Sequence, residues 1–133
     1  MQPGEEPIKV LVRVRPHVAA DKSQTGSPVV IDADGATVSI AKMQKTLTAT
    51  FDAALGMECD QQKMYDAVSP TIEAALHGIN STVLAYGQTG SGKSHTLFGG
   101  LNPDESMLRG EARSMVEGLT SRALRRVFEH AVV

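Results

Sequence analysis

The stretch that decides the fold of this 133-residue chain is Gly87-Gln88-Thr89-Gly90-Ser91-Gly92-Lys93-Ser94. It fits the pattern G-x-x-x-x-G-K-[ST], in which glycines bend a loop so that backbone N–H groups surround phosphate oxygens. Gly87 and Gly92 provide backbone angles and a close approach that a Cβ would block. Lys93 is expected to reach the β and γ phosphates, and the Ser94 hydroxyl to hold Mg²⁺. The pattern therefore predicts a phosphate-binding loop, or P-loop.

The residues on both sides of this loop have the order expected of an α/β protein. Residues 81–86 (Ser-Thr-Val-Leu-Ala-Tyr) form a short, apolar, β-prone run, which predicts a buried parallel strand. A helix is expected to begin at Ser94, where unpaired N–H groups and the positive end of the helix dipole favour phosphate. A strand, a glycine-rich loop and a helix in this order support the P-loop interpretation.

Composition excludes several classes of protein. Hydrophobic residues make up 41% of the chain, which is enough for a folded core. Thirteen basic and fifteen acidic residues give a net charge of −2, which argues against a nucleic-acid-binding protein. The single cysteine, Cys59, excludes an intrachain disulfide, suits a reducing compartment and is interpreted as an ordinary thiol. Without a signal peptide or a long apolar run, we expect a soluble, intracellular chain.

The chain is expected to begin with a disordered lead, residues 1–7, followed by a strand over Ile8 to Arg15 that Pro16 ends. Arg13 and Arg15 emerge near the C-terminal end of this strand. Ligands of open α/β sheets sit beyond that end of the strands, so both arginines and Pro16 can flank a nucleotide base. A solvated strand end remains the alternative.

A small β region is predicted next, after a polar loop over residues 17–28. Residues 29–32 and 37–40 flank a turn that contains Asp34-Gly35, which is a hairpin signal. Residues 45–52 read as a further strand.

From Asp60 the period changes to that of a helix, with Asp60 as its N-cap and His77-Gly78 at its end. Pro70 lies inside this pattern, so it either kinks the helix or starts a second helix with Ser69 as the cap. The predicted apolar face consists of Met64, Val68, Ile72, Leu76 and Ile79.

The helix after the P-loop is expected to be interrupted by Gly99-Gly100, and residues 101–117 read as a long polar insert. A last helix is predicted to begin near Thr120 as N-cap, with Leu119 and Leu124 as a hydrophobic staple.

Four segments together resemble the kinesin motor domain in order and spacing: Arg13-Val14-Arg15-Pro16, Phe51-Asp52, Gln62 to Tyr65, and Ala85 to Thr96. The core of the resemblance, Tyr86 to Thr96, is specific, because few other P-loop families carry Y-G-Q-T-G-x-G-K-[ST]-H-T. It extends from about Ile8 to the C-terminus. The resemblance implies a P-loop NTPase of kinesin type: an α/β fold with a partial central sheet, flanking helices and a small N-terminal β-hairpin region.

The resemblance also implies roles for single residues. Arg13, Arg15 and Pro16 would border the adenine of ATP, together with Tyr65 and His95; an ordinary core or surface side chain is the alternative for the last two. Lys93 and Ser94 would be the catalytic groups, with Ser94 on Mg²⁺. The nucleotide site would comprise, besides these, Gly87, Gln88, Thr89, Gly90, Ser91 and Gly92. The implied partners are microtubules, and the implied location is the cytoplasmic cytoskeleton.

The chain also departs from the family pattern. Kinesins sense the γ-phosphate through N-x-x-S-S-R and D-L-A-G motifs downstream of the P-loop, and neither occurs here. Asp32-Ala33-Asp34-Gly35 spells D-x-x-G but is interpreted as turn chemistry. Residues 8–133 are therefore expected to be the N-terminal part of a motor domain that lacks both switches and the microtubule-binding elements. A truncated module that binds nucleotide without hydrolysis stays open, as does an unrelated P-loop phosphotransferase, for which acceptor-site residues are not found.

The kinesin resemblance has one consequence for folding. It implies that a strand from a later part of the motor lies between residues 8–15 and residues 81–86, and that another late strand borders the other side of residues 81–86. Without both strands, the backbone of residues 81–86 would lack ladder partners.

Overall fold

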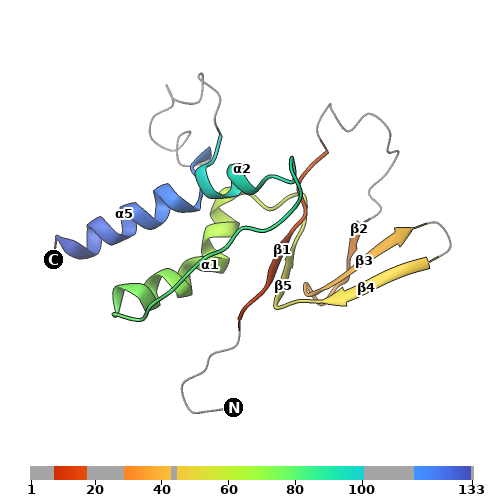
Figure 1. The fold of residues 1–133 in the computed structure, drawn as a ribbon, viewed down its shortest axis with the longest axis horizontal. Helices are drawn as coiled ribbons and strands as arrows, with labels where there is room; N and C mark the ends of the chain where they lie inside the picture. The colour runs from red at the N-terminus through yellow and green to blue at the C-terminus, as the bar shows by residue number, and fades with distance from the viewer. Residues whose placement is uncertain (1–7, 18–28, 43–44, 101–115, 133) are drawn as a thin grey trace, which may run out of the picture. The chain divides into compact units, whose positions relative to one another are not determined.

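The computed structural model describes residues 8–17, 29–42, 45–100 and 116–132 (Figure 1). These residues divide into two compact units, Met1–Glu58 and Cys59–Val133. The expected lead 1–7, most of the expected loop (18–28) and most of the expected insert (101–115) lie outside the described residues. Within the described residues, no helix is both long and apolar enough to span a membrane.

The first unit contains an antiparallel sheet of three strands in the order β2-β3-β4, which are Val29–Ile31, Thr37–Lys42 and Lys45–Thr50. The predicted hairpin is confirmed. Asp34 Oδ1 accepts hydrogen bonds from the N–H groups of Ala36 and Thr37, both at 2.9 Å, and these bonds hold the pKa of Asp34 below its ordinary value. Asp34 is therefore a turn residue, as its sequence context predicted.

A separate parallel pair joins β1 (Leu11–Arg13) to β5 (Ala53–Leu55), with Leu11 opposite Ala53. The predicted strand over residues 8–15 is thus too long, although Val10 O accepts the N–H of Asp52, just before β5, and the Val14 N–H donates to Leu55 O. Ile8 is 90% exposed and has no packing that would extend the strand. The sequence did not predict β5, because three small or aliphatic residues carry no recognisable period.

In the second unit, α1 (Gln61–Leu76) begins as predicted. Asp60 Oδ1 accepts the Lys63 N–H at 2.7 Å and caps the helix. Met64 and Val68 are buried on its inner face, at 7% and 5% exposure. The predicted face is too long by one residue, because Ile79 follows the C-cap at His77 and is 61% exposed.

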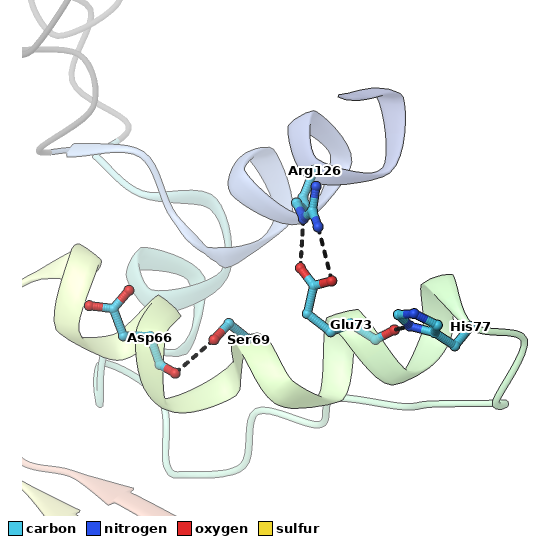
Figure 2. A network of polar contacts seen from close by, with 5 residues as sticks. All are labelled: Asp66, Ser69, Glu73, His77 and Arg126. Atoms are coloured by element: carbon cyan, nitrogen blue, oxygen red, sulfur yellow. Dashed lines mark hydrogen bonds and ion pairs between the residues drawn. The ribbon is translucent and has the colours of Figure 1, made fainter. Parts of the chain in front are cut away.

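Pro70 does not end this helix. A proline cannot donate to the carbonyl four residues earlier, which here belongs to Asp66. The Ser69 hydroxyl donates to that carbonyl instead, at 2.9 Å (Figure 2). A second helix capped by Ser69 is therefore wrong: one helix continues through Pro70, and Ser69 bonds the acceptor that Pro70 leaves open.

The later helices are α2 (Lys93–Phe98), which ends at Gly99 as predicted, and α5 (Leu119–Ala131), which packs against both α1 and α2. The predicted N-cap of α5 is wrong by two residues: Gly118 is the N-cap, and Thr120 lies inside the helix. The predicted staple is also wrong, because Leu119 is buried within the helix while Leu124 is 53% exposed.

Tertiary contact explains this shift at the start of α5. Gly99 and Glu117 form an isolated antiparallel bridge, and the Gly100 N–H donates to Val116 O at 3.0 Å. A Cβ on Gly118 would lie 2.6 Å from the Leu97 carbonyl oxygen, which is too close for any real Cβ. The close approach of two backbones therefore requires glycine at the N-cap.

The predicted strand over residues 81–86 is absent: these residues precede the P-loop without joining either sheet. Leu84 is 84% exposed and Tyr86 is 96% exposed. A β-prone run becomes a strand only when neighbours supply hydrogen bonds and packing, and the described strands pair among themselves instead.

Candidate functional site

The P-loop lies between residues 81–86 and α2. Its turn is closed by the Ser91 N–H, which donates to Gln88 O at 3.2 Å. Gly92 is the N-cap of α2 and has φ +98°, a left-handed conformation that costs other residues free energy. The glycine that the motif requires before Lys93 is thus explained by the backbone.

The side chain of Lys93 folds back over its own loop. Its ammonium donates to the carbonyl oxygens of Gly87 and Gln88, each at 2.8 Å. Because these are the first two residues of the motif, the cation is fixed beside the turn that the glycines form. The lysine side chain is half-buried, so part of the ammonium's hydration is replaced by these carbonyls.

The backbone N–H groups at the start of α2 differ from those further along the helix. Further along, the Thr96 N–H donates to Gly92 O and the Gly99 N–H donates to His95 O, both at 2.9 Å. Within the described part of the chain, no acceptor faces the N–H groups of Gly92, Lys93 and Ser94. Three adjacent donors and an ammonium fit an anion with several oxygens, such as a phosphate chain.

The Ser94 hydroxyl follows the lysine directly and is exposed. A hydroxyl oxygen is a suitable ligand for Mg²⁺, which prefers oxygen and keeps several waters. Among the described residues, no group of three or more His, Cys, Asp or Glu side chains is arranged to hold a metal ion. The Ser94 hydroxyl therefore fits the role of one oxygen ligand of a Mg²⁺ ion.

The predicted base-binding residues fall into both units. Arg13, Arg15 and Pro16 lie in the first unit, where Arg15 Nη1 donates to Pro16 O at 3.0 Å. Tyr65 and His95 lie in the second unit with the P-loop. The structure thus gathers Gly87 to His95 and Tyr65 within one unit.

Tyr65 has a cationic neighbour. The guanidinium carbon of Arg122 lies 6.0 Å from the centre of the Tyr65 ring, at the outer limit of a cation–π contact. One turn earlier on α1, Gln61 reaches His95 on α2.

Sequence reasoning missed three polar residues that the second unit buries: Gln61, Glu117 and Arg122, at 3%, 9% and 6% exposure. Arg122 Nε donates to Glu117 O at 2.9 Å, and another of its nitrogens bonds Gln62 Oε1. No periodic or motif signal marks these positions, because polar residues are normally assigned to the surface.

A family model described as the kinesin motor domain matches residues 13–132. The kinesin heavy chain of Gibberella moniliformis is 38% identical over 111 residues, which are 83% of this chain and 12% of that protein. The kinesin-like protein cut7 of Schizosaccharomyces pombe is 37% identical over 132 residues, 94% of this chain and 12% of that protein.

A solved structure of a fast kinesin, described with its ATPase mechanism and its interactions with microtubules, superposes with a TM-score of 0.76 and 30% identity. The match covers 92% of this chain and 32% of that one. The chain spans between 9% and 18% of the length of eight curated kinesin relatives that it matches. The family model matches residues 13–132 of this chain, and the chain shares a mixed α/β fold with the solved kinesin. This chain therefore belongs to the kinesin motor domain family.

Proposed function

We propose that this chain is the ATP-binding part of a microtubule motor, and that the full-length protein couples ATP hydrolysis to movement along microtubules in the cytoplasm. The observation that carries the proposal is the P-loop, where the Lys93 ammonium is held by the carbonyls of Gly87 and Gln88 beside three open backbone donors. Family membership supports the motor function, and the 32% share of the fast-kinesin chain supports residues 8–133 as one part of a motor domain.

Each group of the loop has a distinct task in this proposal. The N–H groups of Gly92, Lys93 and Ser94 bind phosphate oxygens and orient the chain of phosphates. Lys93 stabilises negative charge that develops on the terminal phosphates during transfer. The Ser94 hydroxyl would hold Mg²⁺, which would supply positive charge to offset that of the phosphates.

In the unit that contains the P-loop, Tyr65 and His95 are proposed to border the adenine. For Arg13, Arg15 and Pro16 the same role rests on the kinesin resemblance alone. A guanidinium or an aromatic ring provides a flat, polarisable surface for a base. Tyr65 is half-buried, and the Arg122 guanidinium lies near its ring. His95 follows Lys93 by two residues, so the phosphate and base ends of the site would share α2.

The proposal is tested by Lys93→Ala in the full-length protein. Loss of a positioned charge at the transferring phosphate should lower the ATPase kcat by at least about 100-fold. Lys63→Ala, which removes an exposed lysine on α1, is the matched control and should leave kcat unchanged. Wild-type turnover in Lys93→Ala would overturn the assignment, and tight ATP binding without any turnover in the wild type would instead favour the non-hydrolysing module.

A further inference from the structure

Gln61 is the most deeply buried polar side chain at the edge of the proposed nucleotide site. It is the first residue of α1 and is 3% exposed. A buried amide is costly unless its hydrogen bonds are made. Its nitrogen donates to the carbonyl oxygen of His95 at 2.6 Å and lies 3.2 Å from Nδ1 of the His95 ring.

The chemistry of this contact fixes the orientation of the amide. A carbonyl oxygen only accepts hydrogen bonds, so the Gln61 atom 2.6 Å from His95 O must be the nitrogen and not the oxygen. That nitrogen carries two protons. One is directed to His95 O, which leaves the other for Nδ1.

We infer that Gln61 is a positioning residue that holds His95 in the tautomer with its proton on Nε2. A donor facing Nδ1 requires a lone pair there, and the neutral imidazole then carries its proton on the other nitrogen. The exposed His95 ring consequently offers a hydrogen-bond donor at Nε2. The ligand it recognises must present an acceptor, such as a base nitrogen or a sugar or phosphate oxygen.

Gln61 also joins two helices. His95 O accepts both the Gly99 N–H, at 2.9 Å, and the Gln61 amide, so the bond connects the first turn of α1 to the end of α2. This backbone contact is independent of the His95 side chain. The experiment must therefore separate a link between helices from control of the ring.

The tautomer is measured directly in the absence of nucleotide. In the full-length protein labelled with ¹⁵N-histidine, comparison with His95→Ala identifies the ring nitrogen signals of His95. The wild type should show protonated Nε2 and unprotonated Nδ1. Gln61→Met, of similar size but without a donor, should shift His95 toward the other tautomer. Gln62→Met is the matched control, because the Gln62 amide bonds Asp66 and Arg122 instead, and its His95 signal should match wild type.

A double-mutant cycle on Mg·ATP affinity gives the functional readout, which rests on the proposed function. Loss of one oriented hydrogen bond should weaken binding about threefold to tenfold in Gln61→Met. Gln61→Met removes the bond to the carbonyl of residue 95 in both backgrounds, so in the His95→Ala background only that link between helices is lost. If Gln61 acts through the ring, the change should have no further effect there.

Two results would overturn the inference: a wild-type His95 protonated on Nδ1, or a Gln61→Met effect of equal size with and without the His95 ring. The first needs no variant of Gln61 and so stands even when that variant does not fold. If Mg·ATP does not bind at all, the proposed function fails while the tautomer measurement still decides the role of Gln61.

Discussion

The ammonium of Lys93 is bonded to the carbonyl oxygens of Gly87 and Gln88, which lie six and five positions earlier in the chain. Gly92, between them, takes up the positive φ that turns the loop into α2. All of these interactions are local, so folding of the loop itself is sufficient to place the charge. The residues proposed to bind the base differ, because Tyr65 and His95 are brought into one unit by two separate helices.

At the same scale, Tyr65→Ala should weaken ATP binding by about 1 kcal/mol, because it removes the aromatic ring that is proposed to stack on adenine. Tyr65→Phe keeps the ring and should bind ATP like wild type. Inorganic triphosphate has no base, so its affinity should not change in either variant, as measured by calorimetry. An equal loss of ATP and triphosphate affinity on Tyr65→Ala would assign Tyr65 to the support of the loop.

Between α1 and α5, one polar contact is bidentate: Arg126 Nε and Nη2 donate to the two carboxylate oxygens of Glu73, at 2.6 and 3.0 Å (Figure 2). The hydrogen bond from Arg126 holds the pKa of Glu73 below its ordinary value, with smaller charge effects from Arg126, His77 and His130. The same carboxylate raises the pKa of Arg126. Both side chains are well exposed, so the pair orients α5 more than it stabilises the fold.

The sign of the pH dependence follows from the lowered pKa. A carboxylate whose pKa falls on folding contributes its full stabilisation above the unfolded value, here 4.5, and loses it as the pH drops through the folded value. In a ¹³C titration of the Glu73 carboxyl group, Arg126→Gln should raise the midpoint. Arg125→Gln is the control, since Arg125 pairs with Glu117 and should leave the Glu73 midpoint where it is. A Glu73 titration midpoint that is the same in Arg126→Gln and in the wild type would contradict the pairing.

At the scale of the molecule, few hydrophobic residues are buried in the part of the chain that the structure describes. The buried hydrophobic residues of the described part are Val38, Cys59, Met64, Val68 and Leu119, and no side chain there is less than 2% exposed. Leu84, Tyr86 and Phe128 are mostly exposed, at 84%, 96% and 67%. Ordering the backbone costs about 1–2 kcal/mol of conformational entropy per residue. The burial of so few apolar side chains offsets only a small part of this cost.

The 133-residue chain by itself is therefore expected to show no cooperative thermal transition, no ATP hydrolysis and no binding to microtubules. The backbone of residues 81–86 has no strand partner in either sheet, and a domain's net stability is only about 5–15 kcal/mol. Differential scanning calorimetry with and without Mg·ATP checks this. A sharp melting transition that ATP shifts upward would refute it, and would show that these residues form a complete nucleotide-binding fold.

The sequence by itself determined what depends on near neighbours. The Asp34 turn, the Asp60 cap, the end of α2 at Gly99 and the phosphate loop all rest on backbone angles and hydrogen bonds within a few residues. The motif around Lys93 also identified the family, because its chemistry requires those residues in that order.

Only the tertiary structure decided what depends on distant partners. Residues 81–86 have strand composition but no ladder, whereas Ala53–Leu55 has little strand signal and pairs with β1. The start of α5 moved to Gly118 because another backbone passes too close for a side chain. Gln61 became part of the proposed site because α2 supplies both of its acceptors. In each case the deciding contact is made with a group far away in the sequence, so a local sequence pattern cannot predict it.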